Sequence, residues 1–360
     1  MYEIETTSVI NEKVRFFGRA TTTNGNNGVF FNWSGSGFII KFIGTSAKAY
    51  FLSGTESDGT PDEKDRAYIG VFIDDNPNAT AHFSLDCKES WYTLTEGLPF
   101  GEHTVRVVKE TEVGYGRAAV LKISSDGEFL SAPKAKGKKI EFIGDSITCG
   151  YGNVCSNASS EFLTREECFS NTYAALTAKM LDTELSCVAA SGNGFYHDYG
   201  CQTFNLIPTL YLYADKMLDE HKGNAAKTWD FNSDKCDLVV IKLGQNDGQF
   251  CSGADLKETD RTEEVLQKRK VDFIPVAKRF LLKITECRPN TPIILIYESD
   301  MYLKDEIIKA ADGVPNINLM EIAPKRSYEG IGANGHWSVY THSRVAAELA
   351  ERIKEILCLQ

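Results

Sequence analysis

The stretch Lys139-Ile-Glu-Phe-Ile-Gly-Asp-Ser146 decides the fold expected for most of this chain. Its short apolar run, ended by glycine and two polar residues, is typical of a buried strand that leaves a sheet into a loop. Comparable apolar runs recur at residues 184–190, 237–244, 292–299 and 317–322. Segments of helical periodicity separate them, so we predict a parallel sheet with helices on both faces.

The segments between these runs supply the expected helices. Apolar residues from Tyr173 to Leu181 fall at helical spacing behind Ser170, a candidate N-cap. Residues 260–287 and 341–359 show the same period over greater lengths. Ligands of open parallel sheets bind beyond the carboxyl ends of the strands, which is where the loop that holds Ser146 is expected.

The chain upstream of this sheet has a different pattern. Nine short apolar or alternating runs lie between Val14 and Ser124, with Gly, Asn and Asp between them. Strands at this spacing predict an antiparallel β-sandwich. The polar, basic stretch 131–138 is broken by Pro and Gly, as linkers often are. We therefore predict a β-sandwich domain at 1–132 and an α/β domain at 133–360.

Charge and hydropathy argue against two classes of partner. The chain carries 39 Lys and Arg against 50 Asp and Glu, a formal charge of −11. Because no basic runs are interleaved with its aromatic residues, we expect no nucleic acid as a partner. The N-terminus has no basic stretch followed by an apolar run, and no run of about eighteen apolar residues occurs anywhere. We expect no membrane span and a cytoplasmic location, or secretion if a leader has been removed.

Cysteine usage gives a further expectation. The 10 cysteines form no zinc-type C-x-x-C pair, and we expect reduced thiols rather than a disulfide framework. Since no cluster with metal-ligand spacing is recognisable, we expect neither a metal nor another cofactor. The sequence leaves the oligomeric state open, a homo-oligomer included.

Three polar motifs stand where chemistry is expected. Gly144-Asp145-Ser146 follows the first strand of the predicted sheet, and Gly244-Gln245-Asn246-Asp247 follows the most apolar strand. The loop Gly332-Ala-Asn-Gly-His-Trp337 contains His336. A serine hydroxyl becomes a nucleophile when a base takes its proton, and the acyl oxyanion that forms needs preset donors. Ser146, His336 and Asn246 supply these three functions, although the first two motifs taken alone are also common turns.

Elimination favours His336 as the base. The other five histidines are better explained by sandwich strands, a charged stretch, an aromatic loop and a helix start: His82, His103, His221, His197 and His342. The near-neutral pKa of an ordinary imidazole suits proton transfer at physiological pH. After a third strand, Ala190-Ser-Gly-Asn-Gly194 offers Gly192 as a second oxyanion donor, with Gly194 as a rival.

Taken in order, these blocks resemble the SGNH (GDSL-type) hydrolases, whose motifs are Gly-Asp-Ser, Gly, Gly-x-Asn-Asp and a C-terminal His. Upstream, Phe31-Asn-Trp-Ser-Gly-Ser-Gly37 within a β-sandwich resembles carbohydrate esterase family 2. The resemblance implies a jelly-roll domain joined to a flavodoxin-like hydrolase that removes acetyl groups from xylan or related hemicellulose through an acetyl-serine intermediate. It implies Ser146 as nucleophile, His336 as base, and the Ser146 N–H, Gly192 and Asn246 as oxyanion donors.

Asn334 departs from the family pattern, in which this loop often reads Asp-x-His. An amide orients an imidazole, but it does not stabilise the imidazolium as a carboxylate does. The sequence therefore leaves open a triad that includes Asn334 and a Ser–His dyad held by a backbone carbonyl. Sugar rings stack on aromatic faces, and four residues are assigned to substrate binding: Asp145, Gly194, Trp229 and Trp337.

Two other interpretations remain open at this point. The same fold serves lipases and thioesterases, although this charged chain has no obvious amphipathic lid. A non-catalytic carbohydrate-binding protein with a decayed hydrolase site is the second interpretation, and Asn334 keeps it open. The intact Ser146, Asn246 and His336 favour the esterase, whose partner would be an acetylated oligo- or polysaccharide.

Overall fold

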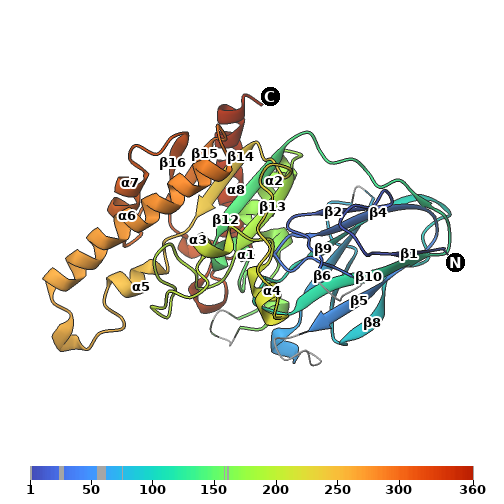
Figure 1. Ribbon diagram of the computed structural model, residues 1–360, viewed down its shortest axis with the longest axis horizontal. Coiled ribbons are helices and arrows are strands. Elements are labelled where there is room, and N and C mark those ends of the chain that lie inside the picture. The colour runs from blue at the N-terminus through green and yellow to red at the C-terminus, as the bar shows by residue number, and fades with distance from the viewer. Residues whose placement is uncertain are drawn as a thin grey trace.

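The computed structural model describes residues 2–23, 28–54, 62–74, 76–157, 159 and 162–359. Figure 1 shows two bodies side by side. The first third of the chain forms antiparallel strands on the right of the view, and the remainder forms a parallel sheet with helices on the left.

Two antiparallel sheets form the first body, and their buried side chains share one core rich in Phe, Val and Ile. One sheet holds β1 (Tyr2–Glu5), β3 (Val29–Phe30), β5 (Ala47–Gly54), β8 (Glu89–Thr95) and β10 (Arg117–Ser125). The other holds β2 (Val14–Phe17), β4 (Gly37–Gly44), β6 (Tyr68–Ile73), β7 (Ala81–Ser84), β9 (Gly101–Lys109) and β11 (Phe129–Leu130).

This pairing confirms the predicted β-sandwich, and nine of its strands coincide with the nine runs of the sequence. The sequence pattern missed β1 and β11. All but one of the four side chains of β1 are exposed, so it shows no apolar alternation. The strand β11 has only two residues, which is too short for any periodicity.

A parallel sheet forms the second body. Its strands are β12 (Lys139–Gly144), β13 (Glu184–Ala189), β14 (Leu238–Lys242), β15 (Ile293–Glu298) and β16 (Ile317–Ile322). All pairings are parallel, and the order is β13-β12-β14-β15-β16. This is a flavodoxin-like order, so the predicted α/β fold is confirmed, strand by strand.

The helices of this body are α1 (Ser146–Cys149), α2 (Tyr173–Met180), α3 (Ile207–Leu210), α4 (Lys216–His221), α5 (Asp247–Cys251), α6 (Glu263–Cys287), α7 (Lys304–Ala311) and α8 (Val339–Leu357). The predicted cap of α2 was wrong. Thr172, not Ser170, accepts a hydrogen bond from the N–H of Ala175, because Ser170 lies one turn earlier in a short 3-10 segment.

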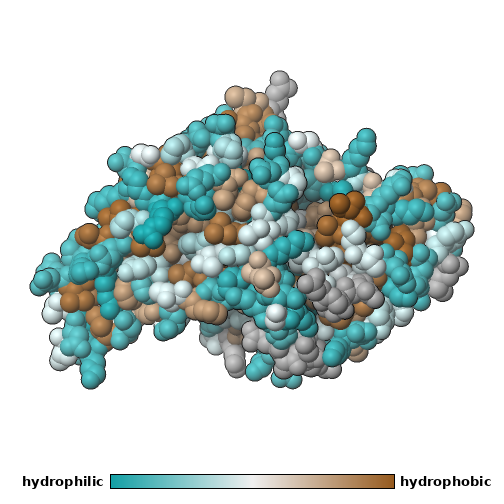
Figure 2. Space-filling view, viewed as in Figure 1, coloured by the Kyte–Doolittle hydropathy of each residue, from teal (hydrophilic) through white to brown (hydrophobic). Residues whose placement is uncertain are grey.

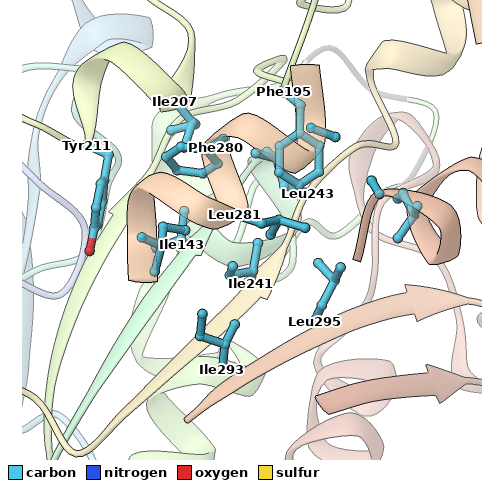
Figure 3. Close-up of a cluster of buried hydrophobic side chains, with 14 of the residues drawn as sticks. Ile143, Phe195, Ile207, Tyr211, Ile241, Leu243, Phe280, Leu281, Ile293 and Leu295 are labelled. Carbon is cyan, nitrogen blue, oxygen red and sulfur yellow. The ribbon is translucent and has the colours of Figure 1, made fainter. Parts of the chain in front are cut away.

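Alternating side chains divide the core of the parallel sheet in two. Ile143, Ile241 and Leu295 point to the face covered by α6, where they share one buried cluster with Phe280 and Leu281 (Figure 3). Their neighbours in the strands point to the opposite face, where α2 and α8 pack. Both faces of the sheet are therefore apolar and covered, as expected for a parallel sheet. The candidate site lies instead at the carboxyl ends of the strands.

The segment 31–37 joins the two bodies. Trp33 is 1% exposed, and its indole Nε1 donates to the carbonyl of Ala214 at 2.8 Å. The amide Nδ2 of Asn32 donates to Asp215 Oδ2 at 2.7 Å. The motif that carried the family resemblance is therefore an interface between the bodies rather than a surface loop.

The described residues contain no helix that is long and apolar enough to cross a membrane. The face of the molecule in Figure 2 mixes hydrophilic residues with smaller hydrophobic groups. All ten cysteines lie in the described part of the chain, and all are free thiols.

Candidate active site

The loops after β12, β13 and β14 meet at one edge of the parallel sheet. The register pairs the last residues of β12 with those of both neighbouring strands, so the three strands end close together. Ser146, Gly192 and Asn246 each follow one of these ends. Three predicted site residues from distant parts of the sequence are therefore brought to one place by the sheet.

Ser146 is the first residue of the short helix α1, directly after β12. The carboxylate of Asp145 caps this helix by accepting the N–H of Ile147 at 3.0 Å. The backbone N–H of Ser146 stands in the first turn, where amides have no intrahelical acceptor. Ser146 is 6% exposed, so its hydroxyl is largely shielded from water.

The imidazole of His336 contacts the serine hydroxyl. His336 Nε2 lies 2.8 Å from Ser146 Oγ, and His336 Nδ1 lies 2.9 Å from the carbonyl oxygen of Ala333. A carbonyl only accepts, so Nδ1 carries the proton and Nε2 offers its lone pair to the hydroxyl. This is the tautomer that a general base for Ser146 requires.

The surroundings of His336 favour its neutral form. Burial lowers the pKa of this imidazole below its usual 6.5, although the hydrogen bond to Ala333 acts in the opposite direction. The positive charges of Lys325 and Lys242 lower the pKa further. The ring is therefore ready to accept a proton at neutral pH.

Asn246 and Gly192 lie at this edge of the sheet with polar groups that can donate to a ligand. Asn246 Nδ2 donates to the carbonyl of Asn193 at 2.8 Å, and because an amide nitrogen carries two N–H groups, one remains for a ligand. Gly192 has a φ of 74°, in the region that favours glycine. A Cβ on Gly192 would meet only the Cβ of Tyr199, at 3.7 Å, so this backbone borders open space.

Gly194, the alternative oxyanion donor, is closely packed, unlike Gly192. A Cβ there would lie 2.2 Å from the carbonyl of His197 and 2.4 Å from Asp247 Oδ2. The carboxylate of Asp247 accepts the backbone N–H groups of residues 195–197 at 2.7 to 2.9 Å. Gly194 is thus packed beneath the loop that Asp247 braces, while Gly192 faces outward.

Asn334 does not orient the imidazole through its side chain. Its Nδ2 donates to the hydroxyl of Tyr151 at 3.1 Å, and the Nδ1 partner of His336 is the carbonyl of Ala333. The geometry is that of a Ser–His dyad held by the main chain. The ring of Tyr151 lies 4.5 Å from the imidazole of His336, so the side chain of Asn334 holds a residue that lines the site.

Trp337 is not a sugar-stacking surface. It is 2% exposed and packs edge-on against Tyr173 and His342, with ring centroids 5.9 Å and 5.4 Å away. The Lys242 ammonium lies over the ring at 5.4 Å. The assignment to substrate binding was wrong because the large indole is buried in the core between α2 and α8.

Trp229 and Asp145 also lie away from any substrate surface. Trp229 Nε1 donates to Asp234, and Asp234 pairs with Lys139 at the end of β12 opposite Ser146. The Arg19 guanidinium also lies over this indole ring, at 5.2 Å. Asp145 is 1% exposed and serves as the cap of α1. The structure therefore places neither side chain where a sugar would bind.

Two aromatic residues that the sequence analysis did not assign lie beside the candidate site. Tyr199 is 63% exposed, and its N–H donates to the carbonyl of Gly192 at 2.7 Å. Tyr151 stacks on Phe162 with ring centroids 3.7 Å apart. The concentration of Phe and Tyr at residues 195–199 was the available signal, whereas nothing in the sequence connects Tyr151 with the histidine loop.

A buried acidic cluster behind the site was also missed. Glu112, Cys149 and Glu167 hold their potential ligand atoms within 4.8 Å of one another, the only such group among the residues that the structure describes. Each of the three is at most 2% exposed. Because glutamates are mostly found at surfaces, no sequence pattern distinguishes Glu112 from a solvated residue.

Comparisons with known proteins find similarity to carbohydrate esterases. Residues 16–133 match the family model described as carbohydrate esterase 2 N-terminal. The chain is 29% identical over 343 residues to a cellulase/esterase of Acetivibrio thermocellus, covering 92% of this chain and 38% of that protein. It therefore spans well under half the length of that relative.

Two further comparisons cover more of the matched protein. An acetylxylan esterase / glucomannan deacetylase of Cellvibrio japonicus is 24% identical over 299 residues, covering 81% of this chain and 77% of that protein. The structure of a family two carbohydrate esterase from Clostridium thermocellum in complex with cellohexaose superposes with a TM-score of 0.81 at 27% identity. That match covers 96% of this chain and 100% of the solved one.

Proposed function

We propose that this chain, a member of carbohydrate esterase family 2, is a serine esterase that removes acetyl groups from xylan or a related hemicellulose. The observation that carries the proposal is the 2.8 Å contact between Ser146 Oγ and His336 Nε2. A relative named acetylxylan esterase / glucomannan deacetylase and a similar structure in complex with cellohexaose support a carbohydrate as the substrate.

In the first step Ser146 Oγ attacks the acetyl carbonyl carbon while its proton passes to His336 Nε2. The carbonyl oxygen becomes an oxyanion, which accepts hydrogen bonds from the Ser146 N–H, the Gly192 N–H and Asn246 Nδ2. When this intermediate collapses, the bond to the sugar oxygen breaks. His336 returns its proton to that oxygen, and a free sugar hydroxyl leaves.

In the second step water replaces the sugar. His336 takes a proton from the water, the hydroxide attacks the acetyl-serine carbonyl, and the same donors hold the second oxyanion. Collapse releases acetate and returns the proton to Ser146 Oγ. The imidazolium that forms in each step faces main-chain carbonyl dipoles, chiefly that of Ala333 at Nδ1, so its charge is less well stabilised than beside a carboxylate.

The sugar is proposed to lie along the aromatic wall of the site. Tyr199 borders Gly192, and Tyr151 borders His336. Aromatic faces of this kind bind sugar rings through their apolar surface. An ester held between them would reach Ser146 from the open side of the oxyanion loop.

Acetate release from acetylated xylan, glucomannan and cello-oligosaccharides tests this function. We expect activity in the wild type and a fall in kcat of about 10⁴-fold or more in Ser146→Ala and in His336→Ala. The double variant should resemble either single variant, because the two side chains act as a unit. Substantial activity in folded Ser146→Ala would refute the assignment.

A series of ester substrates separates this function from that of a lipase. Acetate esters of an aryl alcohol should be hydrolysed faster than butyrate esters, and octanoate esters slowest. Faster hydrolysis of octanoate than of acetate would favour a lipase on the same fold. Binding of the oligosaccharides without any acetate release would favour a non-catalytic binding protein.

A further inference from the structure

A carboxylate of the sandwich reaches into the candidate active site. Glu112 belongs to the loop after β9 and is 2% exposed. Its Oε2 accepts the backbone N–H of Ser191 at 2.5 Å, and Cys149 Sγ lies 3.7 Å from the same oxygen. One oxygen from the first body therefore contacts two separate segments of the second.

Both contacted segments carry catalytic groups. Ser191 directly precedes Gly192, the outward-facing donor of the oxyanion loop. Cys149 is the last residue of α1, the helix that begins with Ser146. A shift of the Ser191 peptide would rotate the next peptide unit, which bears the Gly192 N–H.

The protein fixes Glu112 from both sides. Lys109 Nζ, which is buried, donates to the carbonyls of Thr111 and Glu112 at 2.9 Å and 2.7 Å. The carboxylate of Glu167 accepts the backbone N–H of Glu112 at 3.1 Å. These contacts fix the backbone from which the Glu112 side chain reaches Ser191.

Glu112 and Glu167 are neighbouring carboxyl groups, and both are buried. Glu112 Oε1 and Glu167 Oε1 are both buried without a hydrogen-bond partner among the described residues. Burial and the nearby charge of Glu112 raise the pKa of Glu167 well above its usual range. Burial also raises the pKa of Glu112, but the Ser191 N–H opposes that shift. Glu112 Oε2 nonetheless accepts the Ser191 N–H, a hydrogen bond that is stronger when the acceptor is ionised.

We propose that Glu112 is a positioning residue for the oxyanion site, so that the sandwich completes the catalytic machinery of the other body. Its carboxylate holds Ser191 in the orientation that aims the Gly192 N–H at the acyl oxygen. This inference rests on the proposed esterase function. It concerns only the geometry of the donors and not the choice of sugar.

Variants of Glu112 test the role through kcat rather than KM. Oxyanion donors act in the transition state, and loss of one donor costs about 10²- to 10³-fold in kcat. A misplaced donor should cost less, so we expect Glu112→Ala to lower kcat about 10- to 100-fold with KM within about twofold. Glu112→Asp keeps the charge but withdraws the acceptor, and we expect a loss of similar size.

Glu112→Gln is the conservative variant. Its amide oxygen accepts the Ser191 N–H, and its NH₂ group takes the place of Glu112 Oε1, which has no hydrogen-bond partner among the described residues. It should recover most of the kcat that Glu112→Ala loses. If folded Glu112→Gln is as slow as Glu112→Ala, an acceptor for Ser191 is not what matters, and the inference is wrong.

Glu110 provides a matched control. It is 1% exposed, lies on the same loop and also reaches across the interface. Its carboxylate accepts the Ser170 N–H at 2.8 Å and the Ser170 hydroxyl at 2.7 Å. No contact of its carboxylate reaches α1 or the oxyanion loop among the described residues. Glu110→Ala should lose stability as Glu112→Ala does while kcat stays within about twofold of wild type.

A second readout avoids turnover altogether. An aryl alkylphosphonate reacts once with Ser146 and places its P–O oxygen where the oxyanion forms. Its rate constant should fall in Glu112→Ala and Glu112→Asp by about the factor seen in kcat, and stay near wild type in Glu110→Ala. Equal rates in the Glu112 and Glu110 variants would overturn the inference. If the wild type releases no acetate, the proposed function fails, and the phosphonate rates alone decide the role of Glu112.

Discussion

At the residue scale, the dyad depends on the main chain rather than on a third side chain. His336 Nδ1 bonds to the oxygen of Ala333, three residues earlier in the same short loop. A carbonyl fixes the tautomer as well as a carboxylate does, but it supplies only a dipole when the ring becomes charged. Burial and the neighbouring lysines also oppose that charge. The site therefore keeps its base neutral over a wide pH range at some cost in stabilising the imidazolium.

This balance predicts the pH dependence of the reaction. Only neutral His336 accepts the serine proton, and its pKa is lowered, so kcat/KM should rise with pH through an inflection below 6.5 and then level off. Lys325→Met removes one of the charges that lower this pKa, and should move the inflection upward. Profiles of kcat/KM against pH for the wild type and for Lys325→Met measure both inflections. An inflection above 6.5 in the wild type would contradict the lowered pKa of His336.

Asn334 tests whether a third side chain takes part. Because the Ala333 carbonyl remains in place, Asn334→Ala should lower kcat by less than about tenfold, or ~1.4 kcal/mol of transition-state stabilisation. Asn334→Asp should bring no gain, since this side chain points at Tyr151. A loss of about a thousandfold in folded Asn334→Ala would make Asn334 a member of a triad.

At the element scale, the sequence predicted what periodicity encodes. Buried strands such as β12 and β14 are continuous apolar runs, and their ends place Ser146 and Asn246. Periodicity does not tell which large residue fills a core, so Trp337 was assigned to the substrate. Nor does it report contacts across the interface, and Glu112 therefore could not be distinguished from a surface glutamate.

The packing of α8 on α2 contains a group that should respond to acid. His342 is 1% exposed, and its Nδ1 accepts the N–H of Tyr173 at 3.1 Å. Burial lowers the pKa of His342 to about 3. The unfolded chain takes up this proton below about 6.5, whereas the folded chain does so only near 3, so His342 favours the folded state fully above 6.5.

We therefore expect stability to fall as the pH drops from 6.5 towards 3, with His342 contributing up to about 1.4 kcal/mol per pH unit. His342→Asn keeps an acceptor for the Tyr173 N–H but does not titrate, so its stability should fall less steeply. Urea unfolding of both proteins at a series of pH values measures the difference. Identical slopes would show that His342 is not buried as a neutral ring.

At the scale of the whole molecule, the two bodies share buried polar groups. Arg19 of the sandwich lies at 1% exposure, donates to the carbonyl of Tyr211 and pairs with Glu141 of β12 at 3.3 Å. Arg288 pairs with the same carboxylate at 2.9 Å. Although burial opposes ionisation, the charges of both arginines lower the pKa of Glu141. If the two bodies separated, Arg19 would leave Glu141, and the surfaces that bury these charged groups would become exposed to water.

The chain should therefore unfold in one cooperative transition rather than as two independent domains. Asn32→Ala removes the partner of Asp215 Oδ2 and should lower the free energy of unfolding by about 1–3 kcal/mol, because a buried acceptor loses its donor. Calorimetry measures both effects. Two separate transitions in the wild type would contradict an interlocked interface.

Mass spectrometry of the protein during turnover tests the role of Ser146 most directly. Wild-type protein quenched while it hydrolyses an aryl acetate should carry one acetyl group, and peptide mapping should place that group on Ser146. Folded Ser146→Ala should carry none and release no acetate above background. An acetyl group on another residue, or acetate release by Ser146→Ala at a rate comparable to wild type, would contradict the Ser146–His336 mechanism.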